Sequence, residues 1–259
     1  MSNSESKSQG SSSKIVIFAA LIVGAVAMVV VGMFLGLFDS EDKADPAEPV
    51  PAPTAAEPAP PTQEPTMSPE EIAEMERQTM ELIDAQHRLI DGDPRALGAL
   101  DAPVVIETYK DYNCGYCQAF HIDVFGELQP LIDDGTIRIE QNFMPVLGEA
   151  SFLAAKAALA AANQNGFWEY DHALYTTTLE KTPENLLAIA EELGIFDMAQ
   201  FEADMNSEET AAIIQSEYEN AMSLGITGTP AFLIGYSYVP GYIEADQFIS
   251  VIESELNRK

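Results

Sequence analysis

The chain has 259 residues, of which 47% are hydrophobic, and a formal net charge of −30. Such an acidic chain lacks the basic surface that phosphate binding requires, so nucleic acid is excluded as an expected partner. Its 2 cysteines cannot build a disulfide framework, and their close spacing is more typical of a reactive pair than of a structural staple.

The N-terminal region predicts a membrane anchor. Residues 1–14 form a short Ser-rich, polar tail, and residues 15–38 are an apolar run without charge or proline. As a helix this run would be roughly 36 Å long, enough to cross a hydrocarbon core of about 30 Å. It is longer than the apolar region of a cleavable signal, about 7–15 residues, and it ends in Phe38 rather than in small residues. We therefore expect an uncleaved transmembrane signal anchor.

The charges that flank the span predict its orientation. Lysines precede it and acidic residues follow it closely: Lys7 and Lys14, then Asp39, Glu41 and Asp42. The positive-inside tendency then places residues 1–14 in the cytoplasm and the rest of the chain outside. In a bacterium this is a single-pass inner-membrane protein that faces the oxidising periplasm.

A tether and a helix are expected to follow the span. Residues 39–67 are rich in Pro, Ala and Glu, which favours an extended linker. Ser68 and Pro69 are typical of a helix start, and the apolar pattern predicts a helix over residues 68–91. This helix either packs on its own domain or mediates oligomerisation, and both interpretations remain open.

The two cysteines lie at a predicted strand-to-helix turn. Residues 103–110 predict a strand, and a helix follows over residues 118–133, kinked or divided near Pro130. With Asn113 as the helix cap, Cys114 would occupy the first turn, where free N–H groups and the helix dipole stabilise a thiolate. Cys117, one turn later, would face the core. Cys114 would then attack or be attacked, and Cys117 would resolve the mixed disulfide.

The remaining elements predict an α/β framework interrupted by helices. An alternating strand over residues 136–143 completes a parallel, right-handed βαβ unit. The residues that follow predict only helices, whereas the C-terminal part predicts a strand, a turn and a last helix. The ranges are 154–162, 167–179, 182–194 and 207–224 for the inserted helices, then a strand over 231–235 directly after Pro230, turn 239–242 and helix 245–256.

This order of elements resembles the DsbA-like branch of the thioredoxin superfamily. The resemblance covers about residues 94–257 and is carried by Cys114-Gly115-Tyr116-Cys117 together with Gly228-Thr229-Pro230. It implies an α/β thioredoxin fold over residues 94–149 and 225–259, with a helical insertion at 150–224. It also implies that Cys114 is the nucleophile, that Cys117 is the resolving thiol and that Pro230 is a cis-proline. Thr229 would then offer its backbone to an extended substrate.

The same resemblance implies a protein-disulfide oxidoreductase that needs no cofactor. Its partners would be secreted proteins with thiols or disulfides and a membrane protein that recycles the cysteine pair. The Gly-Tyr dipeptide and Thr229 are more similar to periplasmic isomerases than to the strongest oxidases. Oxidase, isomerase and reductase activities therefore stay open, and the isomerase or reductase alternative includes oligomerisation through residues 68–91.

The resemblance also has a departure from its pattern. Many relatives carry a buried acid six residues before the first cysteine, where this chain has Thr108. Glu107 is adjacent, but a shift of one residue places it on the opposite strand face. Whether Glu107 replaces the missing acid is left open. Tyr116 and Phe120 are candidate contacts for a substrate peptide at the rim of the site.

Metal binding is the main alternative for the cysteines. Cys114, Cys117 and His121 offer three possible zinc ligands, but a structural site needs a fourth, and neither His87 nor His172 belongs to a ligand pair. Covalent haem attachment requires histidine directly after the second cysteine, a position that Gln118 occupies here. We therefore favour redox chemistry over a metal-binding periplasmic module, with His121 and His172 on helix surfaces.

Overall fold

The computed structural model describes residues 67–258. The expected polar tail, transmembrane segment 15–38 and almost all of the tether lie outside these residues. Among the residues described, every helix is too short or too polar to span a bilayer. The contacts divide the chain between Glu76 and Arg77, inside helix α2 (Pro69–Asp84), and the description below concerns residues 77–258.

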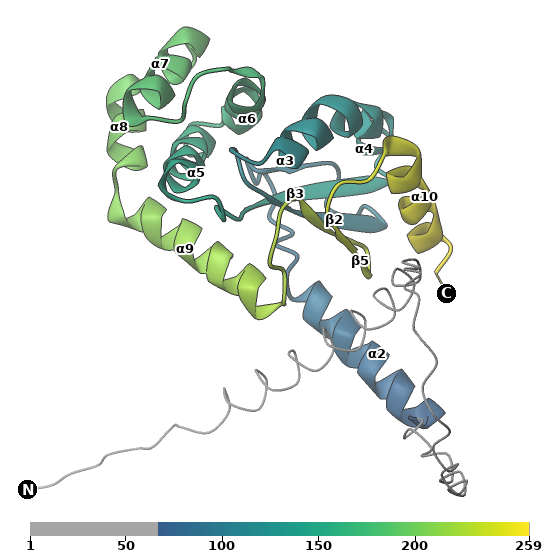
Figure 1. The fold of residues 1–259 in the computed structure, drawn as a ribbon. Coiled ribbons are helices and arrows are strands. Elements are labelled where there is room, and N and C mark those ends of the chain that lie inside the picture. The colour runs from purple at the N-terminus through teal and green to yellow at the C-terminus, as the bar shows by residue number, and fades with distance from the viewer. Residues whose placement is uncertain (1–66, 259) are drawn as a thin grey trace, which may run out of the picture. The chain divides into compact units, whose positions relative to one another are not determined.

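A five-stranded sheet, in the order β1-β3-β2-β4-β5, forms the centre of the fold (Figure 1). The predicted βαβ unit is confirmed, because β2 and β3 are parallel and Val104 pairs with Ile137. The other strand pairs are antiparallel. The strands are β1 (Ala96–Leu97), β2 (Val104–Lys110), β3 (Ile137–Phe143), β4 (Ala231–Ile234) and β5 (Ser237–Pro240). The two-residue β1 was not predicted, since two residues carry no alternating pattern.

Both faces of the sheet are covered, which explains why all of β2 is buried. On one face, Ile106 packs with Phe120 and with Phe248 of helix α10 (Ala245–Leu256). On the other face, Tyr109 packs with Met144 and with residues that precede β4. The face that carries Ile106 is the one that receives the helices following the cysteines.

The helical segment after β2 is divided more often than the sequence predicts. It runs through α3 (Gly115–Ala119), a π-helical turn (Phe120–Val124), a 3-10 turn (Phe125–Leu128) and α4 (Gln129–Asp133). Pro130 lies in the first turn of α4, where its missing N–H costs no helical hydrogen bond. The predicted division at Pro130 is therefore present, but the helical geometry already changes at Phe120.

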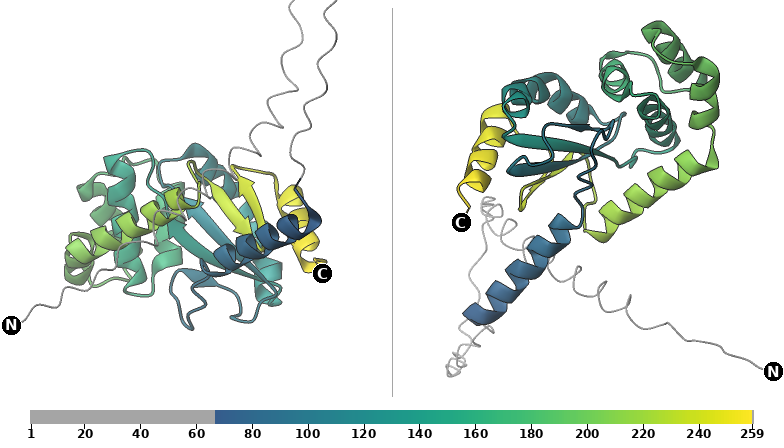
Figure 2. Two further views of the ribbon diagram at one scale, coloured as in Figure 1. Left: turned by 90° about the horizontal axis from the view of Figure 1, so that it is seen from below. Right: turned by 180° about the vertical axis from the view of Figure 1, so that it is seen from behind.

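Five helices lie between β3 and β4 and are drawn in green, on the side away from α10 (Figures 1 and 2). Thr182 and Ser207 cap two of them, as their sequence positions predict. The short fourth helix was not predicted, although the Asp197 side chain accepts from two backbone N–H groups at its start. The helices are α5 (Glu149–Ala162), α6 (Phe167–Thr176), α7 (Pro183–Leu193), α8 (Met198–Met205) and α9 (Glu208–Ser223).

The predicted helix over residues 68–91 is wrong in its last turns, because α2 ends at Asp84. The Glu140 carboxylate on β3 accepts from the backbone N–H of Arg88 at 2.6 Å and of Leu89 at 3.1 Å. These N–H groups bind the sheet instead of the preceding helical turn, and Leu89 has a positive φ of 46°. A buried carboxylate far along the chain thus ends the regular structure here.

The predicted turn at residues 239–242 also lies too late in the chain. Val239 and Pro240 belong to β5, and the chain reverses at Gly235, whose φ of 53° suits glycine. Pro240 is tolerated because β5 is an edge strand, where a missing N–H breaks no ladder bond. The C-terminal helix over residues 245–256 is confirmed.

Candidate active site

The cysteine pair lies just beyond the carboxyl end of β2. Cys114 is the N-cap of α3, so the cap lies one residue later than predicted, and the Cys114 carbonyl accepts from the N–H of Gln118 at 3.0 Å. Asn113 is not the cap, because its side chain donates to Ser151 Oγ at 3.0 Å. Cys117 is fully buried and Cys114 partly exposed, and both are free thiols. One sulfur can therefore be reached from solvent, and the other cannot.

The environment of Cys114 stabilises its thiolate. Hydrogen bonding from the Cys117 thiol, with contributions from the Thr229 side chain and from backbone N–H groups of α3, lowers the pKa of Cys114 to about 5. The N–H groups belong to Cys117 and Tyr116, in the first turn of the helix. When protonated, the Cys114 thiol donates to the Thr229 carbonyl oxygen at 3.2 Å, a contact that favours the neutral form. The hydrogen-bond donors to the sulfur outweigh this contact and the effect of burial, so the pKa of Cys114 is lowered.

The same arrangement has the opposite effect on Cys117. Burial raises the pKa of Cys117 far above its usual value, and the neighbouring Cys114 raises it further. One backbone donor reaches the sulfur, the N–H of Asp111 at 3.4 Å. At neutral pH the reduced pair therefore holds one thiolate, on Cys114, and one thiol, on Cys117.

The loop before β4 completes the site from the far end of the chain. The Thr229–Pro230 peptide bond is cis, as the resemblance implies. The contact between Cys114 Sγ and the Thr229 carbonyl joins residues 115 positions apart. The structure therefore brings Cys114, Cys117, Thr229 and Pro230 together at one point.

The two aromatic residues expected at the rim differ in position. Tyr116 exposes 67% of its surface, and its ring lies 6.2 Å from the ring of Tyr242. Phe120 is fully buried between Phe232 and Phe248, so its expected role as a rim contact is wrong. The change to π-helical geometry at Phe120 accompanies its inward position.

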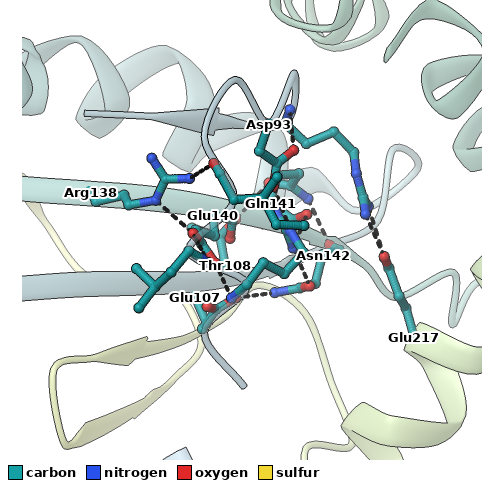
Figure 3. A network of polar contacts seen from close by, with 12 residues as sticks. Asp93, Glu107, Thr108, Arg138, Glu140, Gln141, Asn142 and Glu217 are labelled. Carbon is teal, nitrogen blue, oxygen red and sulfur yellow. Dashed lines mark hydrogen bonds and ion pairs between the residues drawn. The ribbon is translucent and has the colours of Figure 1, made fainter. Parts of the chain in front are cut away.

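Thr108 stands where many relatives carry a buried acid, and Glu107 precedes it. Their side chains point to opposite faces of the sheet. Thr108 faces the cysteine side, as Ile106 does, and its hydroxyl donates to Gln141 Oε1 at 2.6 Å. Glu107 points to the other face, where Asn142 donates to it at 2.5 Å, and Figure 3 shows both residues within one network of polar contacts. Burial, together with the Glu140 carboxylate, raises the pKa of Glu107 to about 8. Glu107 therefore does not replace the missing acid.

The sequence reasoning missed a second polar cluster, on the cysteine side of the sheet. His121, expected on a helix surface, is 8% exposed, and its ring contacts Asp171 and His172 of α6. Lys110 and Tyr112 also contact Asp171, which is fully buried. Lys110, at the end of a strand that begins with three apolar residues, was the available signal, since a buried lysine requires a partner.

The histidines considered as zinc ligands lie in two different places. The structure pairs His121 Nε2 with His172 Nδ1 at 2.9 Å, and His87 lies in another part of the fold, near Glu140. Within residues 67–258, no group of three or more His, Cys, Asp or Glu side chains is arranged to hold a metal ion.

Known proteins share this fold and sequence. The thioredoxin family profile matches residues 91–254. The probable disulfide bond formation protein D of Bacillus anthracis is 28% identical over 176 residues, which cover 63% of this chain and 79% of that protein. A thioredoxin-like oxidoreductase from Silicibacter pomeroyi DSS-3 superposes with a TM-score of 0.57 and 31% identity, over 66% of this chain and 100% of that one.

A further solved structure, oxidised BdbD from Bacillus subtilis, has a TM-score of 0.57 and 24% identity, over 63% of this chain and 93% of that one. It supports the fold, an α/β thioredoxin architecture with inserted helices. The profile spans well over half of the chain, and its range includes both cysteines and the Thr229–Pro230 bond. The chain thus belongs to the thioredoxin family, in its DsbA-like branch, and is a protein-disulfide oxidoreductase.

Proposed function

We propose that Cys114 and Cys117 are the redox pair of a membrane-anchored enzyme that exchanges disulfides with secreted proteins in the periplasm. The observation that carries this proposal is the contrast between two neighbouring sulfurs: the pKa of Cys114 is lowered to about 5, whereas that of Cys117 is strongly raised. A stabilised, partly exposed thiolate is a good leaving group, and a buried thiol is shielded from other reactants.

The reaction follows from these properties. In the oxidising direction, a substrate thiolate attacks Cys114 of the Cys114–Cys117 disulfide, and Cys117 leaves. A second substrate thiolate then attacks the substrate sulfur of the mixed disulfide, and Cys114 leaves as a thiolate. Two electrons pass from the substrate to the cysteine pair, and the substrate gains a disulfide. A membrane redox partner would remove these electrons and restore the oxidised enzyme.

The loop that contains Thr229 and Pro230 is suited to hold the substrate. The Thr229 carbonyl lies beside Cys114 Sγ, where an extended peptide would pass the attacked sulfur. Tyr116 is exposed next to the reactive cysteine and offers an apolar contact to such a peptide. We propose these three residues as the substrate-binding part of the site.

The proposed location rests on the sequence upstream of the described residues. The run at residues 15–38 would anchor the chain in the inner membrane with the N-terminus in the cytoplasm. The catalytic part would then lie in the periplasm, where disulfides persist.

The two cysteine variants test this function directly. The wild-type protein, Cys114→Ser and Cys117→Ser are each mixed with a reduced, unfolded substrate protein and a disulfide oxidant. We expect turnover by the wild type, none by Cys114→Ser, and accumulation of a mixed disulfide through Cys114 in Cys117→Ser. Turnover by Cys114→Ser equal to that of the wild type would refute the proposed site.

A disulfide isomerase or reductase is the second candidate. Leu82, in the part of α2 after Arg77, exposes 45% of its surface, an apolar contact that supports self-association through this helix. The oligomeric mass and the reduction potential distinguish the two functions. A monomer near −120 mV is expected of a strong oxidase, and an oligomer with a clearly more negative potential is expected of an isomerase.

A further inference from the structure

A line of titratable side chains leads from the surface to the interior beside the cysteines. His172 of α6 is exposed, and its Nδ1 lies 2.9 Å from Nε2 of His121. Nδ1 of His121 lies 3.4 Å from Oδ2 of Asp171. Two imidazoles thus connect solvent with a fully buried carboxylate.

Charge balance keeps this carboxylate ionised. Burial alone would raise the pKa of Asp171, but the Lys110 ammonium at 3.5 Å, His121 and the Tyr112 hydroxyl at 2.8 Å outweigh it and lower the pKa. Asp171 is therefore a fixed negative charge and a poor proton acceptor. Beside it lies the His121 imidazole, a side-chain type suited to relaying protons in proteins.

His121 lies about one helical turn after the buried cysteine. It follows Cys117 by four residues along the same helical segment, and such residues are neighbours on one helix face. The ring of Tyr175 stacks on His121 with centroids 4.9 Å apart, and its hydroxyl donates to the Asp111 carbonyl at 3.4 Å. The N–H of Asp111 in turn donates to Cys117 Sγ.

The position of Tyr175 supports this proximity. Burial raises the pKa of Tyr175 well above its usual value, and the next largest contributions come from Cys117 and Asp171. Its ring covers the His121 imidazole, and its hydroxyl reaches the Asp111 carbonyl. Tyr175 therefore lies between His121 and the residue whose N–H donates to Cys117 Sγ.

Resting on the proposed roles of Cys114 and Cys117, we propose that His121 supplies the proton that Cys117 takes up when the disulfide is reduced. His121 would recover that proton through His172 from solvent, and the same path would run in reverse on reoxidation. In the proposed reaction Cys117 leaves as a thiolate and takes one proton, while Cys114 stays a thiolate. Of the two protons released by the two substrate thiols, one is therefore balanced at Cys117 and one remains in solvent.

Cys117 needs a proton donor, and the residues at and beside the position of the family's buried acid are not suited to that role. A buried thiolate at Cys117 is strongly disfavoured by its surroundings. Thr108 and Gln141 form a neutral pair at the position of the missing acid, and Glu107 lies on the opposite face of the sheet. The titratable groups in contact with His121 are Asp171, His172 and Tyr175 from α6; Lys110 from β2 contacts the same Asp171, and Cys117 precedes His121 by four residues. Of these, His172 alone connects it to solvent.

The test measures how fast a small thiol reduces the disulfide of the oxidised protein, from pH 5 to pH 9. His121→Gln retains a hydrogen-bonding group toward His172 but cannot carry a proton. We expect it to slow reduction by about 10²-fold at neutral pH, the low end for a lost proton donor, and to flatten the pH profile. His172→Gln should slow the reaction less, and His87→Gln, on a histidine far from this path, is the matched control.

Two further readouts separate proton supply from a structural role. The thiolate titration of Cys114 should be unchanged in His121→Gln. The solvent deuterium isotope effect on disulfide reduction, present in the wild type, should be absent from His121→Gln. If His121→Gln does not fold, nitrogen NMR of the wild type replaces it. The protonation of His121 should then differ between the oxidised and reduced proteins.

The outcomes are distinct. If the wild type exchanges its disulfide while His121→Gln keeps the wild-type rate and pH profile, the relay is refuted and the proposed function stands. Unchanged His121 protonation between the redox states likewise refutes it. If the wild type itself forms no reducible Cys114–Cys117 disulfide, the proposed function is refuted, and the relay that rests on it is refuted with it.

Discussion

At the residue scale, two chemically identical side chains acquire opposite properties from their surroundings. Cys114 is at a helix N-terminus with several hydrogen-bond donors, whereas Cys117 is fully enclosed one turn later. A more stable thiolate at Cys114 favours the reduced enzyme, and therefore makes the oxidised enzyme a stronger oxidant. The Cys114 environment is thus the main determinant of the redox direction.

The contribution of Thr229 to this environment can be measured by a nearly isosteric change. Thr229→Val removes the side-chain contact and keeps the backbone carbonyl, so the pKa of Cys114 should rise by up to about one unit. Alkylation rates as a function of pH report this pKa. Thr227→Val, on an exposed neighbour, is the control and should leave it unchanged. An unchanged pKa in Thr229→Val would mean that the side chain plays no part.

A second residue-scale prediction concerns the buried Glu107. Its pKa of about 8 lies above the unfolded value of about 4.3. Unfolding therefore releases a proton between these values, and the free energy of unfolding falls as pH rises through this window. Glu107→Gln removes that dependence. The free energy of unfolding of the variant, minus that of the wild type, should therefore rise between pH 5 and pH 8 by on the order of 2 kcal/mol. Denaturant unfolding at both pH values measures it.

Glu140 provides the contrasting control in the same network (Figure 3). Its carboxylate pairs with Arg138 at 2.6 Å and accepts two backbone N–H groups, contacts that lower its pKa despite burial. Glu140→Gln loses the charge that pairs with Arg138 and should destabilise the protein at both pH values. If Glu107→Gln changed the free energy of unfolding equally at pH 5 and pH 8, Glu107 would not be held protonated between these pH values in the folded protein.

At the scale of elements, the sequence predicts what depends on local pattern. The strand before the cysteines, the capped helices after Thr182 and Ser207 and the last helix were all recognisable. Their periodicity and caps act within a few residues. The cysteine motif and the Thr229–Pro230 bond were recognisable in the same way, since short motifs carry them.

Elements that depend on distant contacts were not predictable. α2 ends at Asp84 because the N–H groups beyond it bind Glu140, more than fifty residues later. The π-helical turn at Phe120 and the inward position of His121 depend on packing against α6. The polar cluster around Asp171 joins three elements. No local pattern contains this information.

Gly98, in the loop between β1 and β2, is an element-scale constraint. Its φ is 97°, and a Cβ at this position would overlap the Ile137 carbonyl oxygen of β3. Gly98→Ala should therefore destabilise the protein by about 2 kcal/mol or more, measured by denaturant unfolding. Gly126→Ala is the matched control, because nothing lies within 4 Å of a Cβ there. Equal stability of the two variants would contradict the close approach.

At the scale of the whole molecule, the active site depends on both halves of an interrupted fold. Cys114 and its contact Thr229 are separated in the chain by the five helices of the insertion. The same insertion supplies Asp171 and His172 of α6, so it contributes side chains beside the buried cysteine as well as bulk. Deleting the insertion would therefore remove the α6 side chains of the proposed proton path.

The proposed anchor is a whole-molecule prediction. The full chain expressed in a bacterium should remain with membranes after alkaline carbonate washing and be released by detergent, because residues 15–38 would span the bilayer. The chain beginning at Met67 should stay in the soluble fraction. Recovery of the full-length chain in the soluble fraction would contradict the anchor.

The central claim is that Cys114 is a stabilised thiolate and Cys117 its buried partner thiol. Ultraviolet absorbance of the thiolate, recorded during a pH titration of the reduced protein, tests it most directly, with Cys114→Ser as the blank. We predict one ionisation with a midpoint of about 5, absent from the blank, and none from Cys117 below pH 9. A midpoint near the free-thiol value of about 8.5 would contradict the account.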